Sequence, residues 1–346
     1  MISSLNTKRL RLLSLVAAVS VLGVACAAPN IEPSSGEEDG GNQSGEIVVS
    51  GSSTVEPITG LVAEKFQSEN PSVAISVDGP GTGDGFELFC NGETDISDAS
   101  RAITPEEAEV CEQNSVEFIE LKVAIDGLSV ITSPENDQVD CLDFKDLYAL
   151  LGPESQGFTK WSDANELGEE IGAGHTPYPD VPLTVTAPGE ESGTYDSFVE
   201  IVIEDLAEER GQKAVSRPDY QASPNDNVII EGITGSPTSL GWVGLAFYVQ
   251  NEDAVKALEV EGGDGCVAPS ADTVSSGEYP IARDLFIYVS ADRLEGNEAL
   301  SSFVDFYMSD DGLASVNEVG YVDLAESDIE ATHAVWDSKE LGTREG

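Results

Sequence analysis

Three short turns rich in glycine, serine and threonine carry hydrogen-bond donors suited to a small anion. They are Ser52-Ser53-Thr54, Thr82-Gly83 and Ser192-Gly193-Thr194. Each follows a strand-like segment and opens a helix-like one, so its backbone N–H groups are free to point at a ligand, and its hydroxyl groups add further donors. One such turn is more often a simple helix cap than a binding site. The threefold repetition predicts an anion site between two lobes of the chain.

Arg101 adds a cation to these donors. A guanidinium next to Ser100 offers a planar fork suited to a tetrahedral oxyanion, although a surface ion pair would explain it equally well. The chain has 16 Lys and Arg against 65 Asp and Glu, and its net charge of -49 excludes general attraction to nucleic acid or to anionic lipid. Because the Debye length is about 8 Å at physiological ionic strength, surface carboxylates act weakly in a closed cleft.

The residue patterns of common enzyme classes do not occur in the sequence. There is no Gly-x-Ser-x-Gly elbow, no Gly-x4-Gly-Lys-Ser/Thr loop and no Cys-x2-Cys pair. The two histidines, His175 and His333, give little material for a catalytic triad or a metal site built from several histidines. We therefore predict a protein that is not an enzyme, with no catalytic residues, no cofactor and no metal.

Strand-like and helix-like segments alternate around the three turns. Strands are expected at 46–50, 73–77, 183–186, 227–232, 240–248 and 285–289, with two more between 116 and 131; helices are expected at 58–66, 86–89, 104–111, 144–151, 195–206, 299–307 and 312–316. This alternation predicts an α/β fold with largely parallel sheets. The helix at 104–111 has the start signals Thr104, Pro105 and Glu107.

The N-terminal residues have the layout of a secretory signal. Basic residues precede an apolar run from Leu12 to Ala25, and Cys26 follows where a lipid is attached in bacterial lipoproteins. The next residues are Pro, Ser, Gly and acidic residues with little to bury. We predict a signal peptide at 1–25 and a flexible tether at 26–45 that is lipidated at Cys26.

The four remaining cysteines are an even number in a chain predicted to be exported, which suggests two disulfides. They are Cys90, Cys111, Cys141 and Cys266. Three pairings are possible. We favour Cys90 with Cys111, which flank one predicted helix and loop, and Cys141 with Cys266 in the other lobe.

An ordered series of motifs resembles the PstS-type periplasmic phosphate-binding proteins, the receptors of ABC phosphate importers. The series is Gly51-Ser52-Ser53-Thr54-Val55-x-Pro57-Ile58, Gly81-Thr82-Gly83-x-Gly85-Phe86, Asp95-Ile96-Ser97-x-Ala99-Ser100-Arg101, Glu191-Ser192-Gly193-Thr194, Asn225-Asp226-Asn227-Val228 and Leu240-Gly241-x-x-Gly244. The resemblance implies a type II binding-protein fold in which two α/β lobes, joined by two hinge strands, close over one phosphate. We expect lobe 1 at 46–128 plus 286–346 and lobe 2 at 129–285.

Carried over by position, the resemblance implies a set of phosphate ligands. They are Ser53, Thr54, Thr82, Gly83, Ser100, Arg101, Ser192, Gly193 and Thr194. Many relatives place an acceptor Asp near the position of Ser100, and that carboxylate accepts the proton of hydrogen phosphate and so rejects sulfate. Asp84 and Glu191 are candidates for this role here.

The function implied is extracytoplasmic phosphate capture, with delivery to an ABC permease by a protein held at the membrane through its lipid. Three alternatives remain open at this point. They are a receptor for sulfate, molybdate or another oxyanion, a surface sensor or adhesin, and a phosphoester hydrolase, for which no metal cluster or activated nucleophile is visible in the sequence.

Overall fold

The computed structural model describes residues 44–190, 192–263 and 265–344. The predicted signal peptide, Cys26 and nearly all of the predicted tether lie outside these residues, as does Glu191. No helix in the described part of the chain is long and apolar enough to cross a membrane.

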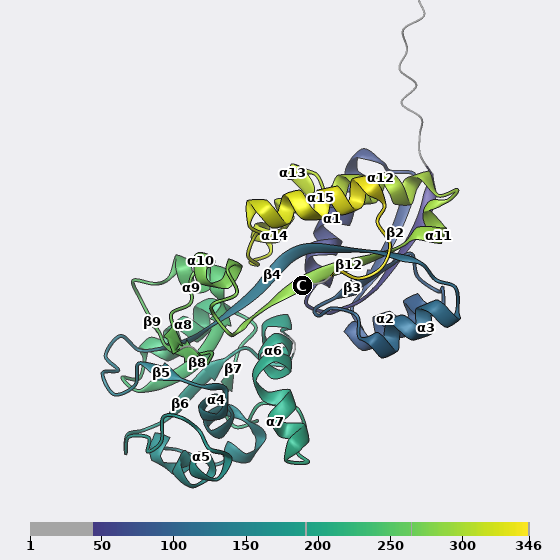
Figure 1. Ribbon diagram of the computed structural model, residues 1–346. Helices are drawn as coiled ribbons and strands as arrows, with labels where there is room; N and C mark the ends of the chain where they lie inside the picture. Colours follow the sequence, from purple (N-terminus) through teal and green to yellow (C-terminus); the bar gives the residue numbers. More distant parts are fainter. Residues whose placement is uncertain (1–43, 191, 264, 345–346) are drawn as a thin grey trace, which may run out of the picture. The chain divides into compact units, whose positions relative to one another are not determined.

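The elements form two groups, which we call the first and second lobes (Figure 1). The first lobe comprises β1 (Gly45–Gly51), α1 (Glu56–Glu69), β2 (Val73–Asp78), α2 (Thr82–Cys90), β3 (Ile96–Ala99), α3 (Pro105–Gln113), α11 (Ala291–Leu294), α12 (Glu298–Tyr307), α13 (Asp310–Leu313), α14 (Ser315–Glu318) and α15 (Glu326–Ser338).

The second lobe comprises β5 (Cys141–Leu142), α4 (Phe144–Leu151), η1 (Pro153–Ser155), η2 (Trp161–Ala164), α5 (Asn165–Ile171), β6 (Thr184–Ala187), α6 (Gly193–Phe198), η3 (Val199–Ile203), α7 (Glu204–Glu209), β7 (Gln221–Ala222), α8 (Asp226–Thr234), β8 (Ser239–Gly244), α9 (Leu245–Gln250), β9 (Lys256–Ala257), β10 (Glu259–Glu261), β11 (Cys266–Val267) and α10 (Ala271–Ser275). Two strands, β4 (Phe118–Thr132) and β12 (Ala282–Ser290), connect the lobes.

One sheet runs through both lobes in the order β2-β1-β3-β12-β4-β8-β6-β7, with β9 also paired to β4. The pairs β1–β2, β1–β3, β6–β8 and β6–β7 are parallel, whereas β12 and β4 are antiparallel to each other and to their neighbours. The parallel pairing expected from the sequence thus holds within each lobe, and the antiparallel strands lie where the chain crosses between lobes. The two-lobed α/β fold with two connecting strands is confirmed.

The sequence predicts two strands around Asp126 and Gly127, but the structure has the single strand β4 there. It is one strand of 15 residues, and all but one of them are buried. Asp126 interrupts the apolar pattern but stays in the ladder, where it lies opposite Arg283 of β12. The predicted lobe boundaries, at 128/129 and 285/286, fall inside β4 and β12.

The prediction of a strand at 227–232 is wrong, because these residues belong to helix α8. Asn225 caps this helix by accepting a hydrogen bond from the N–H of Asn227, and Ile229 and Ile233 are buried at helical spacing. The strand expected at 240–248 ends at Gly244, where α9 begins. The capping box predicted from Thr104 and Glu107 is present at the start of α3.

Each lobe has its own hydrophobic cluster. Val49, Ile58 and Phe303 are buried in the first lobe's cluster, and Trp161, Phe198 and Trp242 in the second lobe's. The rings of Phe198 and Trp242 stack with their centroids 4.1 Å apart, which fixes the helical run α6–η3–α7 on the sheet of the second lobe. Separate clusters allow the lobes to move as units about β4 and β12.

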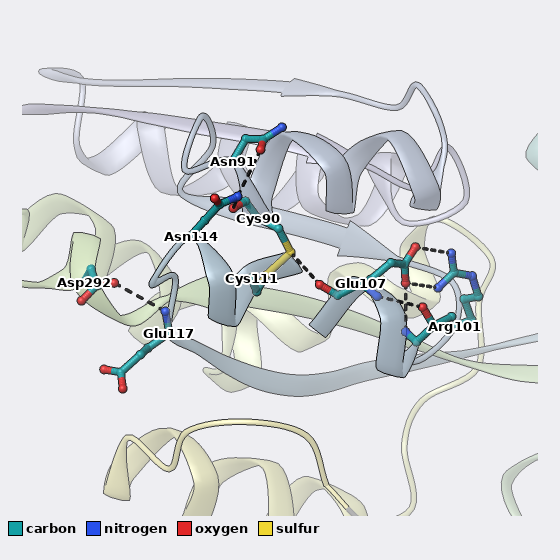
Figure 2. Close-up of a disulfide and its surroundings, with 9 residues drawn as sticks. Cys90, Asn91, Arg101, Glu107, Cys111, Asn114, Glu117 and Asp292 are labelled. Carbon is teal, nitrogen blue, oxygen red and sulfur yellow. Dashed lines mark hydrogen bonds and ion pairs between the residues drawn. A yellow bond between two sulfur atoms is a disulfide. The ribbon is translucent and has the colours of Figure 1, made fainter. Parts of the chain in front are cut away.

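The four described cysteines lie as two pairs at disulfide distance, matching the favoured pairing. Cys90 and Cys111 join α2 to α3, with Cα atoms 4.3 Å apart (Figure 2). Cys141 and Cys266 join β5 to β11 in the second lobe, with Cα atoms 6.1 Å apart. The first pair lies just behind α2, whose first turn faces the cavity described next.

Candidate anion-binding site

A cavity of about 660 Å³ lies between the two lobes. Its lining comes from the β2–α2 turn, the segment after β3, the helical run α6–η3–α7 and the start of β12. The residues are Pro80, Gly81, Thr82, Gly83, Asp84, Ser100, Arg101, Ala102, Glu200, Ile201, Glu204, Arg283, Asp284 and Phe286. Predicted ligands from two separate turns therefore meet at one cavity.

The β2–α2 turn depends on glycine for its conformation. Gly81 precedes α2 with φ +123°, a region that residues with a Cβ rarely adopt. The N–H of Gly81 donates to the carbonyl of Gly51 at the end of β1, which has φ +151° and no room for a Cβ beside the backbone of Asp98. The hydroxyl group of Thr82 accepts the N–H of Ser100 at 3.1 Å and lies 2.9 Å from the Ser100 hydroxyl. These bonds join the second and third predicted ligand segments into one rigid edge of the cavity.

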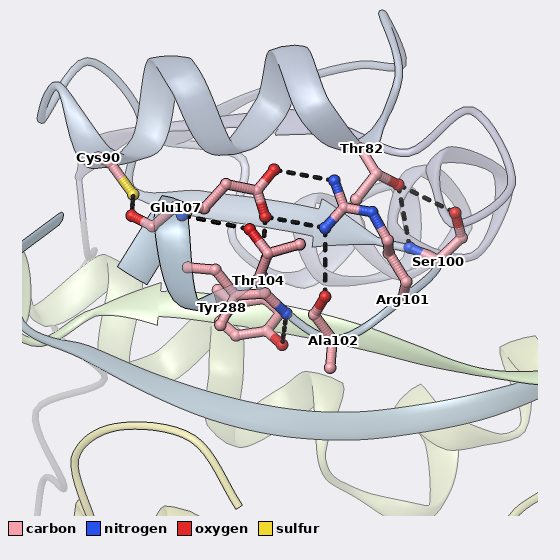
Figure 3. A network of polar contacts seen from close by, with 9 residues as sticks. Thr82, Cys90, Ser100, Arg101, Ala102, Thr104, Glu107 and Tyr288 are labelled. Carbon is pink, nitrogen blue, oxygen red and sulfur yellow. Dashed lines mark hydrogen bonds and ion pairs between the residues drawn. The ribbon is translucent and has the colours of Figure 1, made fainter. Parts of the chain in front are cut away.

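Arg101 lines the cavity but already has a carboxylate partner. Its guanidinium makes two hydrogen bonds of 2.8 Å with Glu107 and a third, of 3.2 Å, with the carbonyl of Ala102 (Figure 3). The hydrogen bond with Glu107 raises the pKa of Arg101. Burial is the strongest single influence on the pKa of Glu107 and acts to raise it. The hydrogen bonds from Arg101 and Thr104 together outweigh burial, so the pKa of Glu107 is lowered. Since a guanidinium has five N–H donors, two remain for an anion.

The first and last predicted turns meet each other across the lobes. The Ser53 hydroxyl donates to Asp196 Oδ2 at 3.0 Å, and the hydroxyl groups of Thr54 and Ser197 are 3.3 Å apart. Asp196 and Ser197 belong to α6, which begins at Gly193. Burial raises the pKa of Asp196, and the Ser53 bond opposes this shift.

Arg283 connects the two groups of predicted ligands, and the sequence analysis did not identify it. Its Nη2 donates to Thr54 Oγ1 at 3.1 Å and to Ser197 Oγ at 3.0 Å, and its Nη1 pairs with Glu200. Only 14% of its side chain is exposed. The available signal was a basic residue, one of 16, two positions before a predicted apolar strand.

Asp126 provides a buried counter-charge for Arg283. Its Oδ2 lies 3.5 Å from Arg283 Nε, and 3% of its side chain is exposed. Burial raises the pKa of Asp126, and the charge of Arg283 opposes that shift. The Arg283 guanidinium therefore lies between two carboxylates, Asp126 in the strand ladder and Glu200 at the cavity.

Comparison with known proteins identifies the family of this chain. Residues 36–311 match the model described as a PBP superfamily domain. The chain belongs to the PBP superfamily. Within that superfamily it is 36% identical to Protein SphX of Synechocystis over 94% of this chain and 89% of the relative. It is also 32% identical to the phosphate-binding protein PstS of Staphylococcus aureus, over 82% of this chain and 79% of that protein.

Solved structures of the PBP superfamily agree with this assignment. A possible phosphate binding protein from Planctomyces limnophilus superposes with a TM-score of 0.77 at 34% identity, covering 86% of this chain and 99% of that one. PstS from Borrelia burgdorferi has the same fold, with a TM-score of 0.58 at 24% identity, over 81% of this chain and 99% of that one.

The predicted ligands of this PBP-superfamily chain do not all line one cavity. Thr82, Gly83, Ser100, Arg101 and Asp84 line the cavity. Ser53 and Thr54 contact α6 beside it, at the residues that Arg283 also reaches. Ser192 accepts the N–H of Thr194 as a helix cap, Gly193 lies against the first turn, and Thr194 lines a second cavity of about 240 Å³.

Proposed function

We propose that this PBP-superfamily protein binds one inorganic phosphate between its lobes and delivers it to the permease of an ABC transporter. The observation that carries the proposal is that a donor of the first lobe and a cation of a connecting strand each contact a carboxylate on the helical run α6–η3–α7 of the second lobe. Ser53 donates to Asp196, and Arg283 donates to Glu200. A carboxylate oxygen resembles a phosphate oxygen in charge and acceptor geometry, so the donors are already oriented for an oxyanion.

Phosphate would replace these internal acceptors. Ser53, Thr54 and Arg283 would then donate their hydrogen bonds to the anion. On the β2–α2 side the anion would contact Thr82, Gly83, Ser100 and Arg101. At the start of α6 it would contact Ser192, Gly193 and Thr194. Because the donors come from both lobes, the anion binds the closed arrangement more tightly than an open one. That difference in affinity drives closure, which is the signal that a permease can read.

The carboxylates around the cavity repel an anion and so oppose the attraction of Arg101 and Arg283 for it. Asp84, Glu200, Glu204 and Asp284 all line it. Burial raises the pKa of Glu204, with further contributions from Glu200, Glu208 and Asp205. Such a lining favours a ligand that brings its own proton, because a protonated oxygen donates to a carboxylate that would repel a fully ionised anion. Hydrogen phosphate has this proton at neutral pH and sulfate does not, and Asp84 is our candidate acceptor.

The rest of the proposal concerns export and attachment. We propose that the signal at 1–25 directs secretion, that Cys26 carries a lipid, and that residues 26–45 tether the lobes to the outer face of the membrane. The sequence similarity to SphX and PstS supports a binding protein rather than an enzyme. We propose boundaries between lobe 1 and lobe 2 at the two connecting strands, as predicted.

The test is calorimetric titration of the full chain, stripped of bound anion, with phosphate, then with sulfate and with molybdate, at low and high salt. We expect one phosphate per chain and no displacement by sulfate. Heat with sulfate or molybdate but not with phosphate would favour a receptor for another oxyanion. No heat with any of these anions would reject the transport function and leave the sensor or adhesin function.

A further inference from the structure

A second group of ligand-type side chains lies in the second lobe, outside the anion cavity. Asp143, His175 and Glu261 each offer one ligand atom, and these three atoms lie within 4.8 Å of one another. Asp143 caps α4, Glu261 ends β10, and His175 follows α5 in a loop. All three side chains are partly buried, so they are held by the fold and still reachable from solvent.

His175 is oriented by a buried carboxylate. Asp146 Oδ2 lies 2.6 Å from His175 Nδ1, and Asp146 Oδ1 accepts the backbone N–H of His175 at 3.2 Å and the hydroxyl of Tyr178 at 2.7 Å. The Asp146 side chain is fully buried. Because Nδ1 faces this carboxylate, Nε2 is the ring nitrogen that is left to face a ligand. Nε2 lies 3.7 Å from Glu261 Oε2.

Asp143 is also fixed before any ligand arrives. Its Oδ1 accepts the N–H of Asp146 at 2.7 Å and its Oδ2 accepts the N–H of Gly174 at 2.8 Å. Burial raises the pKa of Asp143, and the hydrogen bonds from the N–H groups of Asp146 and Gly174 oppose this shift. Among the described residues, no lysine or arginine forms an ion pair with Asp143 or Glu261. One imidazole thus faces the side chains of three acidic residues, Asp143, Asp146 and Glu261.

We propose that Asp143, His175 and Glu261 bind a divalent metal ion of the Zn²⁺ type, with water as the fourth ligand and Asp146 as the residue that positions His175. One nitrogen and two carboxylate oxygens are ligands that Zn²⁺ accepts at about 2.0–2.2 Å. At those bond lengths tetrahedral ligand atoms lie about 3.3 Å apart. The 3.7 Å between His175 Nε2 and Glu261 Oε2 is close to this value, and the ligand atom of Asp143 lies within 4.8 Å of the other two ligand atoms.

The carboxylate behind the imidazole distinguishes this cluster from a chance group of surface acids. A metal-bound histidine typically donates its other N–H to a carboxylate or carbonyl, which fixes the tautomer and strengthens the ligand. That arrangement is complete here without a metal. His175 also lines a cavity of about 350 Å³, and all three ligands are partly exposed to solvent.

The position of the cluster suggests what the ion would do. The three ligands come from the N-terminus of α4, the end of β10 and the loop after α5, and the pair Cys141 and Cys266 joins the same small sheet. A metal ion would fasten the loop and the β10–β11 hairpin to α4. We therefore expect it to stabilise the second lobe without changing phosphate affinity directly.

The test uses the full chain, made without a histidine tag, oxidised, and treated with a chelator. ZnCl₂ is titrated calorimetrically in an excess of MgCl₂, which occupies weak sites on the acidic surface. We expect one Zn²⁺ per chain and a Zn²⁺-dependent rise in Tm. His175→Gln and Glu261→Gln should each weaken binding at least about tenfold, and Asp146→Asn about 10- to 100-fold at unchanged stoichiometry.

His333→Gln is the matched control, because His333 is the other histidine of the chain and its Nε2 contacts the carbonyl of Met308 in the first lobe. This variant should bind Zn²⁺ like the parent. Because Asp146 is buried, the result for Asp146→Asn counts only if its circular dichroism spectrum is unchanged. If the Asp146→Asn variant unfolds, Glu261→Gln still tests the site, since Glu261 is partly exposed. Equal binding by the His175 and His333 variants, or no binding by the parent, would overturn the proposal.

A thiolate site next to the carboxylate cluster is the alternative that the same titration can detect. Cys141, His175 and Cys266 form a second set of potential ligands at the same distance limit, but the two sulfurs can bind a metal only as free thiolates. Zn²⁺ binding that appears only after reduction, and that a Cys141→Ser/Cys266→Ser variant loses, would reject the carboxylate site in favour of a thiolate site.

Discussion

Asp126 and Arg283 face each other across the two strands that connect the lobes, directly opposite in the β4–β12 register, with Oδ2 and Nε 3.5 Å apart. The same guanidinium bonds to Thr54 of the first lobe and Ser197 of the second. A single partly buried cation therefore touches both lobes and the strands about which they would move.

Replacing Arg283 with Gln should lower phosphate affinity at least about 100-fold. The variant removes a charge-assisted donor from the cavity and leaves Asp126 buried without its counter-charge, which costs about 3–5 kcal/mol for a buried pair. Isothermal titration measures the affinity, and urea unfolding measures the stability. Arg210→Gln is the control, since Arg210 pairs with Glu154 and Glu170 away from the cavity.

The double variant Arg283→Gln/Asp126→Asn separates the two effects. Neutralising Asp126 should restore much of the lost stability, because no unpaired buried charge remains, but it should not restore phosphate affinity. Recovery of both properties together would mean that Arg283 contributes only to the fold.

The sequence was sufficient for the fold and for the turns, because their signals are local. The capping box of Thr104 and Glu107 and the glycine at position 81 specify helix starts without reference to the rest of the chain. The prediction failed at 227–232, where the β-branched residues Val228, Ile229 and Ile230 favour a strand. Packing of Ile229 and Ile233 against the second lobe selected a helix there instead.

The contacts of Arg283 could not be predicted, because they depend on pairing between strands more than 150 positions apart and on the approach of the two lobes. No local pattern marks Arg283 as different from a surface arginine. The sequence predicted the turn residues one by one. It did not predict that Ser53 and Thr54 contact α6 instead of lining the cavity, because that contact also depends on the approach of the two lobes. The clustering of His175 with Asp143 and Glu261 has the same origin.

Replacing Glu107 with Gln should raise phosphate affinity by about threefold to tenfold. Glu107 holds the Arg101 guanidinium with two hydrogen bonds, and its charge competes with an anion for the same cation. Glutamine still accepts hydrogen bonds, so the capping of α3 is largely kept. Because the pair is partly exposed, the loss of stability should stay below about 1 kcal/mol. A fall in affinity would show that Glu107 orients Arg101 rather than competing for it.

Asp98 should make the stability fall between about pH 4 and pH 8. Burial raises the pKa of Asp98 to about 8 from its ordinary value of 3.8, although the hydrogen bond from Thr59 opposes the shift. In this window the folded state keeps a proton that the unfolded state releases, so rising pH favours unfolding, and the effect is complete above pH 8. An Asp98→Asn variant should lack this loss.

The measurement for Asp98 is the difference in unfolding free energy between the parent and Asp98→Asn at several pH values. Other carboxylates cancel in that difference. The asparagine variant should gain stability relative to the parent as pH rises through the window. A difference that is flat with pH would mean that Asp98 is ionised in the folded protein.

The two cysteine pairs should be found as disulfides in the exported protein. Non-reducing peptide mapping by mass spectrometry should link Cys90 to Cys111 and Cys141 to Cys266. Replacing the second pair with serine should lower the free energy of unfolding by about 2–5 kcal/mol, since its link closes the longer loop, with a sequence separation of 125. Peptides linked in either of the other two pairings would contradict this arrangement.

Asp84→Asn should reduce the preference for phosphate over sulfate. Asp84 lies in the first turn of α2 and lines the cavity next to Gly83, where an anion bound at the helix start would present an oxygen to it. A carboxylate there accepts the proton of hydrogen phosphate and repels sulfate, whereas an asparagine can donate to either anion. Sulfate affinity should therefore rise while phosphate affinity falls.

Competition titration of phosphate against sulfate measures this ratio in the parent, in Asp84→Asn and in Glu87→Gln. Glu87 is the control because it lies on the same helix, is exposed and does not line the cavity. An unchanged ratio in Asp84→Asn would discard Asp84 as the acceptor. The discriminating carboxylate would then be sought among Asp196, Glu200 and Glu204, which approach the anion from the second lobe.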